Sequence, residues 1–451
     1  MDGLNLRTIC SVVYGTPCNI SDYTVEPNRI VIDSRDITTD DLFAAFKGEK
    51  ADGHDYIESA LNKGACCCLA EYIPEGIEGP VIIVKSVEEA MEQIAQEYRS
   101  RISIPVIGIT GSNGKTTAKE MISSVLGQRF TVLKTDKNLN NQLGVPMTVS
   151  SITKNHTAAV IEMGVSKKND MDVLGKIVRP DIAVFTNIGH AHLEFLDNLE
   201  GVFLEKTKVL QYMDADATAV INGDDPFLNG LQCRQRIIRY GFGDNCDVRA
   251  CGVSFSKETG NLSFTVNCFG TEIPIDAPAY GKHIVYAALE AAAVGTVMDI
   301  SPEEIIRGIG GYKIVGRRSS VIHTDAFTII DDCYNANPDS VKSGIDSMMM
   351  IPGRHLCILG DMLELGKTSD RLHFEIGKYA AEKGCECVLA YGTEAANIAE
   401  GAESIGVYCR EYDDFVKEIQ NTIREGDVIL VKASRSMNFE RITEMLRQFS
   451  L

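Results

Sequence analysis

The chain has 451 residues, of which 44% are apolar and 24% are charged, so it should fold into two to four domains at roughly 100–200 residues each. The 63 acidic residues outnumber the 44 basic ones and give a net charge of −19, which argues against sequence-independent binding of nucleic acid. No apolar run reaches the roughly 18 residues of a membrane span, and the N-terminus lacks the hydrophobic segment of a signal peptide.

The fourteen cysteines occur singly, as the triplet Cys66 to Cys68, or as the pair Cys385 and Cys387. None has the CxxC spacing that is typical of a zinc site. Reduced thiols in a cytoplasmic protein are therefore expected.

The first block, residues 1–103, has short strand-like runs at 29–32 and 81–84. It ends in a helical pattern over 86–101, where Ser86 and Glu89 have the spacing of a capping box. We predict a small α/β domain here, followed by a short polar linker.

The second block, residues 104–318, alternates apolar runs with helical patterns, which predicts a doubly wound, mostly parallel sheet. Residues 245–280 instead show an alternating pattern around a turn at 259–261, which indicates appended antiparallel strands. The expected parallel strands are 106–110, 158–163, 181–187 and 217–222.

The third block, residues 319–451, also alternates apolar runs with helical patterns, which predicts a Rossmann-like α/β domain. Its expected strands are 327–330, 356–359, 387–390 and 428–431. The fold class is therefore α/β, in three domains.

A phosphate-binding loop is the sharpest local motif. The apolar strand at 106–110 leads into GSNGKTT and then into a helix, so that backbone N–H groups and the helix N-terminus would face an anion. Lys115 is expected to reach the terminal phosphates, and the Thr116 hydroxyl to ligate Mg²⁺. The strict GxxxxGK[ST] pattern is not met, because Ile109 stands at its first glycine. The predicted nucleotide-binding residues of this loop are Gly108, Thr110, Gly111, Ser112, Asn113, Gly114, Lys115, Thr116 and Thr117.

Alone, this loop would fit a motor, a transporter ATPase, a kinase or a ligase. A mechanical ATPase would need a strand ending in aspartate after the loop, and we find none in the sequence. Other segments must decide between these classes.

GITGSNGKTT is similar to the variant phosphate loop of the Mur ligase family, which includes folylpolyglutamate synthases. Further segments follow in the order that the family has, and the resemblance spans nearly the whole chain. They are DSR (33–35), LFAAFKGEKADGH (42–54), NLNNQLGVP (138–146), IEMG (161–164), TNIGHAHLE (186–194), DDCYNANPDS (331–340), LGDMLELG (359–366) and KASR (432–435).

NLNN, YNANPDS and GDMLELG resemble the branch that adds D-alanyl-D-alanine to UDP-N-acetylmuramoyl-tripeptide, a cytoplasmic step of peptidoglycan precursor synthesis. The resemblance implies an ATP-dependent ligase that works through an acyl phosphate, with ATP and two Mg²⁺ ions as cofactors and a monomeric chain. It also implies that residues 1–103 bind the UDP-sugar, 104–318 bind ATP, and 319–451 bind the dipeptide and close over ATP.

Two metal ligands besides Thr116 follow from the resemblance. Glu162 ends an expected strand and His192 lies just past another, and such strand ends converge on the ligand crevice of a doubly wound sheet. A carboxylate suits Mg²⁺ better than an imidazole does. His190 would point away from His192 if the segment is extended, and it is as consistent with a structural role.

Lys206 lies fourteen residues after His192 and resembles the family lysine that is carbamylated and helps to bind the second Mg²⁺. Lys208 is close enough to be the alternative. A solvated helix lysine is the competing interpretation of either residue.

For the adenosine, the family often carries GxHNxxN, but GKHIVYA places Ile284 and Ala287 where the asparagines would stand. His283 remains as a candidate, whereas base recognition by the two amides cannot be carried over. The resemblance further implies that Arg317 reaches the phosphates and that Asp331 or Asp332 accepts a hydrogen bond from the ribose.

The substrate-binding candidates also rest on the resemblance. The DNPR motif of the diaminopimelate-adding branch is absent from the third block. The candidates are Ser34, Arg35, Lys47 and Gly48 for the UDP-sugar, Asn138, Asn140 and Asn141 beside the phosphate loop, and Asn335, Asn337, Ser434 and Arg435 for the dipeptide.

Three alternatives stay open. The chain could be a Mur-type ligase that adds a single amino acid, a folylpolyglutamate synthase, or a nucleotide-binding regulatory protein without catalysis. The first block disfavours a folate ligase, and only the missing asparagines favour the regulatory protein. The sequence does not fix whether residue three of the tripeptide is diaminopimelate or lysine.

Overall fold

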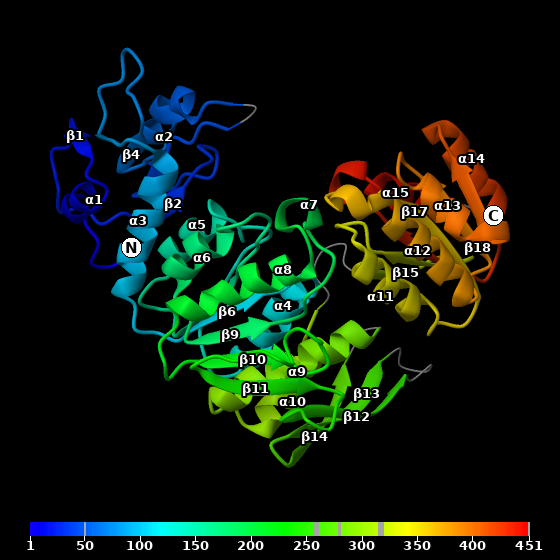
Figure 1. The fold of residues 1–451 in the computed structure, drawn as a ribbon. Helices are drawn as coiled ribbons and strands as arrows, with labels where there is room; N and C mark the ends of the chain where they lie inside the picture. Colours follow the sequence, from blue (N-terminus) through cyan, green and yellow to red (C-terminus); the bar gives the residue numbers. More distant parts are fainter. Residues whose placement is uncertain (49–50, 256–260, 278–280, 314–319, 450–451) are drawn as a thin grey trace.

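The computed structural model describes residues 1–48, 51–255, 261–277, 281–313 and 320–449. Three sheets follow one another along the chain, each with helices against it (Figure 1). The fold class predicted from the sequence is confirmed. Among the described residues, no helix is long and apolar enough to cross a membrane. All fourteen cysteines are free thiols.

The first region has a five-stranded sheet of order β1-β5-β4-β3-β2, parallel except where β1 pairs with β5. The expected helix at 86–101 is α3, and the Ser86 side chain caps it by accepting a hydrogen bond from the Glu89 N–H. The elements are α1 (Leu6–Val12), β1 (Thr16–Cys18), β2 (Ile30–Val31), β3 (Leu42–Ala44), α2 (Ile57–Asn62), β4 (Cys67–Ala70), β5 (Val81–Ile83) and α3 (Val87–Ser100).

The second region has a nine-stranded sheet of order β14-β13-β12-β11-β10-β9-β6-β8-β7. Pairing is parallel from β7 to β12 and antiparallel from β12 to β14, as the sequence predicts. The strands are β6 (Val106–Thr110), β7 (Val132–Lys134), β8 (Ala158–Glu162), β9 (Ile182–Phe185), β10 (Thr218–Asn222), β11 (Arg236–Gly241), β12 (Val248–Phe255), β13 (Leu262–Cys268) and β14 (Thr271–Ala277). The expected turn at 259–261 lies mostly outside the described residues.

Strand β6 lies between β8 and β9, where the order of the parallel strands reverses. Ligands of open α/β sheets bind at such a switch point, beyond the carboxyl ends of the strands. Helices α4 and α9 share one apolar core on one side of this sheet. The helices are α4 (Lys115–Leu126), α5 (Gly144–Ser150), α6 (Asp170–Val178), α7 (Leu193–Leu196), α8 (Leu199–Thr207), α9 (Lys282–Val297) and α10 (Pro302–Gly310).

The third region has a six-stranded sheet of order β15-β16-β20-β17-β18-β19, parallel except for β15. Its strands are β15 (Ser320–His323), β16 (Thr328–Asp331), β17 (Arg354–Gly360), β18 (Cys387–Tyr391), β19 (Gly406–Cys409) and β20 (Asp427–Lys432). Its helices are α11 (Pro338–Met348), α12 (Ser369–Glu382), α13 (Ala396–Gly401), α14 (Tyr412–Thr422) and α15 (Glu440–Gln448).

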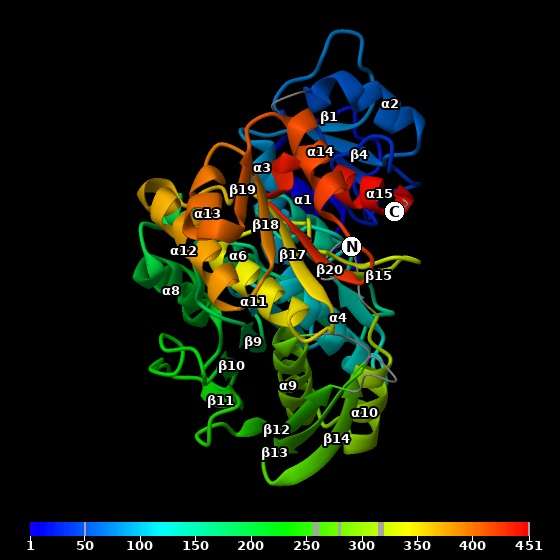
Figure 2. The ribbon, with the colours of Figure 1, turned by 90° about the vertical axis from the view of Figure 1, so that its right-hand side faces the viewer.

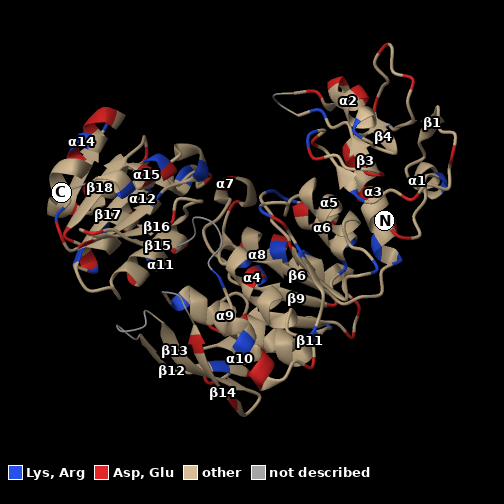
Figure 3. Cartoon of the chain, turned by 180° about the vertical axis from the view of Figure 1, so that it is seen from behind, with Lys and Arg blue, Asp and Glu red and all other residues tan. Residues whose placement is uncertain are grey.

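The second region stands between the other two, and the third region approaches it near α7 (Figure 1). In the turned view, α11 of the third region lies above α9 of the second (Figure 2). Acidic and basic residues are interspersed on all three regions (Figure 3). The acidic excess is therefore not collected on one of them.

A buried carboxyl group lies behind the switch point. Glu290 of α9 is 2% exposed, and its Oε1 lies 2.5 Å from the hydroxyl of Tyr240. That hydroxyl also lies 2.9 Å from the carbonyl oxygen of Phe185, at the end of β9. Burial raises the pKa of Glu290 to about 8, against an ordinary value of 4.5.

This group should make stability depend on pH. Between pH 4.5 and about 8 the native carboxyl keeps its proton while the unfolded one loses it, so the free energy of unfolding falls as pH rises through this range. We expect Glu290→Gln to flatten this fall by an amount on the order of a few kcal/mol at most. Urea unfolding of both proteins at several pH values measures it, and equal pH slopes would contradict the expectation.

Candidate active site

The phosphate loop requires its glycines. Gly111 has φ +145°, and a Cβ there would lie 1.9 Å from Thr186 Oγ1. Gly114 has φ +83° and precedes the first turn of α4. A Cβ at Gly108, inside β6, would lie 2.7 Å from Met163 Cε. Side chains at these positions would strain the loop or displace it from the sheet.

The end of strand β9 holds the loop in place. The Ser112 N–H donates to the carbonyl oxygen of Asn187 (2.9 Å), and the Asn113 N–H donates to Asn187 Oδ1 (3.0 Å). Thr186 Oγ1 donates in turn to the carbonyl oxygen of Asn113 (2.5 Å). Sequence reasoning assigned no role to Thr186 and Asn187, although both belong to the TNIGHAHLE segment.

Lys115 and Thr116 begin α4, directly behind the loop. The Lys115 ammonium donates to the carbonyl oxygen of Gly111 (2.8 Å), so its charge lies over the loop. The Thr116 hydroxyl donates to Glu162 Oε2 (3.0 Å). Thr117 is half-buried in the same turn. The Thr110 hydroxyl, at the end of β6, is buried and has no hydrogen-bond partner within the described part of the chain.

Glu162 ends β8 and is only 2% exposed. Asn140 Nδ2 donates to its Oε1 (2.8 Å), while Thr116 binds its Oε2. Two neutral donors thus fix a buried carboxylate beside the phosphate loop. Its oxygens and the threonine hydroxyl are donors that a hard divalent cation prefers.

The segment after β9 brings two histidines toward the third region. His190 Nδ1 lies 3.1 Å from Asp339 Oδ2, and the His190 N–H donates to the same oxygen (2.6 Å). His192, with φ +57°, has Nδ1 against the carboxylate of Glu364. The hydrogen bond from His192 lowers the pKa of Glu364. Sequence reasoning missed Asp339 and Glu364, which lie in the YNANPDS and GDMLELG segments.

Lys206 and Lys208 have different surroundings. Lys206 of α8 is 1% exposed, and burial together with the charge of Lys115 holds its pKa well below the usual range. Among the residues that the structure describes, its side-chain nitrogen has no ion-pair or hydrogen-bond partner. Lys208 instead bridges Asp172 (2.9 Å) and Glu205 (2.8 Å). The geometry therefore separates a buried amine near the loop from a paired, partly exposed ammonium.

The start of α9 faces the third region. His283 lies there, and burial lowers its pKa. Lys432 of β20 is 2% exposed and forms an ion pair with Asp332 (2.5 Å), while Asp331 is buried at the end of β16. Both groups of this ion pair act electrostatically on His283. Arg317 lies outside the described residues.

The candidates of the first region lie away from the switch point. The Ser34 carbonyl oxygen accepts a hydrogen bond from Lys63 Nζ (2.9 Å). Arg35 is exposed and forms an ion pair with Asp33 (2.7 Å). Lys47 and Gly48 are exposed, and Lys47 Nζ lies 3.8 Å from Asp52.

Asn337 connects the third region to the phosphate loop. Its Oδ1 accepts from the Ser340 N–H and caps α11, while its Nδ2 donates to Asn113 Oδ1 (2.8 Å). Asn335 is exposed, and its Oδ1 accepts from the Ala336 N–H.

Most of the remaining substrate-binding candidates form a hydrogen bond or an ion pair within their own loop. Ser434 Oγ accepts from the Leu363 N–H (2.9 Å), and the exposed Arg435 pairs with Glu440 (3.3 Å). Asn141 Oδ1 accepts from the Gly144 N–H at the start of α5, and Asn138 is exposed.

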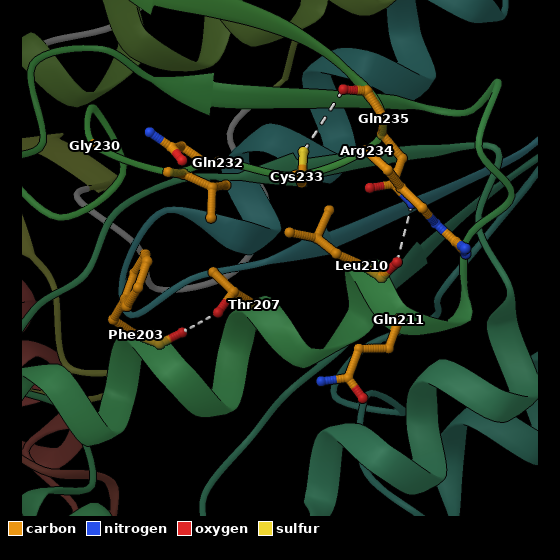
Figure 4. Close-up of a pocket in the computed structure, with 10 residues that line it drawn as sticks. Phe203, Thr207, Leu210, Gln211, Gly230, Gln232, Cys233, Arg234 and Gln235 are labelled. Carbon is orange, nitrogen blue, oxygen red and sulfur yellow. Dashed lines mark hydrogen bonds between the residues drawn. The ribbon is translucent and has the colours of Figure 1, made fainter.

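Two hollows lie near these elements. One, of about 280 Å³, is lined by Thr116 and two charged residues of α4, by Lys134 at the end of β7, and by residues 135–137. The other, of about 770 Å³, lies between α8 and the segment that leads into β11 (Figure 4). Phe203 and Thr207 face this second hollow, whereas Lys206 does not line it. The smaller hollow is thus the one beside the phosphate loop.

Comparison with known families agrees with this geometry. The Mur ligase middle domain matches residues 109–295, the Mur ligase glutamate ligase domain matches 317–435, and the Mur ligase family catalytic domain matches 27–107. A UDP-N-acetylmuramoyl-tripeptide–D-alanyl-D-alanine ligase of Bacillus subtilis is 36% identical over 98% of both chains. The Escherichia coli ligase of that name is 30% identical, over 93% of this chain and 94% of its own.

Solved structures are similar over nearly the full length. A crystal structure of MurF from Acinetobacter baumannii has a TM-score of 0.90 at 27% identity and covers 98% of both chains. The MurF ligase of Thermotoga maritima in complex with ADP has a TM-score of 0.84 at 28% identity, and covers 93% of this chain and 97% of its own. Given these matches and the phosphate loop at the switch point, the chain belongs to the Mur ligase family.

Proposed function

We propose that this Mur ligase joins D-alanyl-D-alanine to UDP-N-acetylmuramoyl-tripeptide, with conversion of ATP to ADP and phosphate, in the cytoplasmic synthesis of peptidoglycan precursors. It is an ATP-dependent ligase that forms an amide bond. The observation that carries the proposal is the cluster of Lys115, Thr116 and Glu162 at the switch point. The full-length similarity to ligases of this name supports the choice of substrates.

The chemistry proceeds in two steps. A carboxylate oxygen of the tripeptide attacks the γ-phosphorus of ATP, the bond to the bridging oxygen breaks, and ADP leaves. The amine of D-alanyl-D-alanine then attacks the acyl carbon, phosphate leaves, and the nitrogen loses a proton. In the first step two anions approach each other, so Lys115 and the loop N–H groups serve by offsetting the charge that develops.

Mg²⁺ would supply further positive charge at the phosphates. Glu162 and the Thr116 hydroxyl are the described residues that fit such an ion, because both present oxygen atoms to one place. Asn140 holds the other carboxylate oxygen and thereby fixes its direction. We assign His192 and a modified Lys206 to a second ion.

We propose that Lys206 is carbamylated. Burial and the charge of Lys115 lower the pKa of Lys206 and so favour the neutral amine, which attacks the carbon of CO₂, forms an N–C bond and releases a proton. The anionic carbamate offers oxygen ligands, and Lys115 attracts its negative charge, whereas Lys115 would repel an ammonium at this position. Lys208 is unsuited to this role, since Asp172 and Glu205 stabilise its charged form.

We assign the three substrates to the three regions. Residues 1–103 bind the UDP-sugar through Ser34, Arg35, Lys47 and Gly48, and residues 104–318 bind ATP and, through Asn138 and Asn141, the tripeptide. In residues 319–451, Asn335, Asn337, Ser434 and Arg435 bind the dipeptide. The chain acts as a monomer.

The selectivity between purine bases should be weak. Ile284 and Ala287 are buried in the apolar core of the second region and present no amide to a base. A missing base contact typically relaxes selectivity by about 1–3 kcal/mol. We therefore expect kcat/KM for GTP within about two orders of magnitude of that for ATP. A preference for ATP of four or more orders would show that other groups read the base.

Phosphate release tests the proposed function. Release should need ATP, UDP-N-acetylmuramoyl-tripeptide and D-alanyl-D-alanine together, and leaving out either acceptor should reduce it to background. Equal or faster release with D-alanine, L-lysine or glutamate in place of the dipeptide would favour a ligase that adds a single amino acid. No release with any amine would favour the regulatory protein.

A further inference from the structure

Glu364 of the third region contacts the segment after β9 that carries His192. It lies after β17 with φ +61°, and its carboxylate meets Nδ1 of His192. Its carbonyl oxygen also accepts from the Glu194 N–H (3.0 Å). Gly366 follows with φ +56°, and a Cβ there would lie 3.3 Å from the Glu194 Cα. The backbone and a side chain of this turn thus both contact the segment that carries His192.

The contact leaves one ring nitrogen of His192 for a ligand. Nδ1 faces Glu364, and Nε2 has no hydrogen-bond partner within the described part of the chain. A histidine that binds a metal usually donates its other N–H to a carboxylate, which fixes the tautomer and the ring orientation. Such a carboxylate stabilises the tautomer that carries its proton on Nδ1 and has its lone pair on Nε2.

We propose that Glu364 is a positioning residue for His192, and that the third region thereby completes a metal site of the second region when it docks. This inference rests on the proposed function, in which His192 is a metal ligand. It differs from that assignment because Glu364 would act through His192 and is not itself assigned to the nucleotide or the metal. Docking of the domain that receives the dipeptide would then raise metal affinity at the phosphate loop, so that metal binding and domain closure favour each other.

A second pair of the same kind offers a matched control. Asp339 of the third region meets His190, two residues before His192, and also accepts its backbone N–H. Loss of Asp339 removes one contact between the two regions but leaves Glu364 in place on His192. It should leave the tautomer of His192 unchanged.

The test is a titration of the full chain with Mn²⁺ in the presence of a non-hydrolysable ATP analogue, with free Mn²⁺ followed by electron paramagnetic resonance. We expect Glu364→Ala to weaken binding of one Mn²⁺ about 10- to 100-fold. Glu364→Gln keeps an acceptor oxygen and should restore part of the affinity. Asp339→Ala should bind within about threefold of the parent. In ligation assays, Glu364→Ala should need about 10- to 100-fold more Mg²⁺, with kcat largely recovered at saturation.

Two results would overturn the inference while leaving His192 as a ligand. One is parent-like binding by Glu364→Ala when His192→Ala loses one Mn²⁺. The other is an equal loss in Asp339→Ala and Glu364→Ala, which would mean that docking alone matters. Parent-like binding by His192→Ala would refute the ligand assignment itself, and the inference with it. Whether phosphate release needs all three substrates together is a separate measurement, so the proposed function is tested independently of this inference.

Discussion

Replacing Lys115 with alanine is expected to abolish ligation and to leave the fold intact. Its ammonium lies over the phosphate loop, held by carbonyl oxygens of the loop rather than by the apolar core. The side chain is half-buried, so its removal leaves no large core cavity. Loss of the charge should cost transition-state stabilisation on the order of several kcal/mol, which is a loss of three or more orders of magnitude in kcat/KM.

The measurement is phosphate release under saturating substrates, together with circular dichroism and thermal unfolding to verify the fold. Lys176→Ala is the matched control, since Lys176 is an exposed lysine of α6. It should keep parent activity. Near-normal turnover by a well-folded Lys115→Ala protein would contradict the assignment of the phosphate loop.

Replacing Lys206 with alanine should remove most activity, and formate or acetate should restore part of it. Each small carboxylate would fill the anionic position that the carbamate occupies in the parent. The same anions should not rescue Lys115→Ala, where a cation is missing. Lys208→Ala is the matched control, because Lys208 sits two residues along the chain and is paired with Asp172 and Glu205.

Two results of this comparison would contradict the assignment. If Lys206→Ala is active and Lys208→Ala is inactive, the modified lysine is Lys208. If both variants are active, the chain works without a carbamate. Mass spectrometry is no substitute for the rescue experiment, because carbamates are lost during denaturation.

The fold could be predicted where local patterns decide it. The capping box at Ser86 and the apolar face behind it predict α3, and alternating residues predict the antiparallel strands β12 to β14. The phosphate loop and the strand end at Glu162 were also predictable, because strand, glycines and helix are contiguous or converge by topology.

Contacts between regions could not be predicted in this way. Glu364 meets His192 across 172 residues, and Asp339 meets His190 across 149. No periodicity or spacing encodes such a pairing, which depends on how two separately folded regions dock. The contact of Asn337 with Asn113 illustrates the same limit, since the sequence places both residues in candidate binding loops but does not show that they meet.

The two buried positions on α9 show a different limit. Ile284 and Ala287 depart from a family motif in the sequence, but only packing shows that both belong to a core. Local sequence patterns do not predict the surroundings of Lys206 either. Lys206 is buried and Lys208 is not, because α8 packs near the phosphate loop.

The most direct test of the central claim uses tripeptide substrate with ¹⁸O in both oxygens of the carboxylate that is activated. An acyl phosphate transfers one of these oxygens to phosphate and keeps the other in the new amide. Mass spectrometry of one reaction mixture should therefore find singly labelled phosphate, unlabelled ADP, and a pentapeptide product with one ¹⁸O at the new bond. Unlabelled phosphate, or label in AMP, would contradict the account.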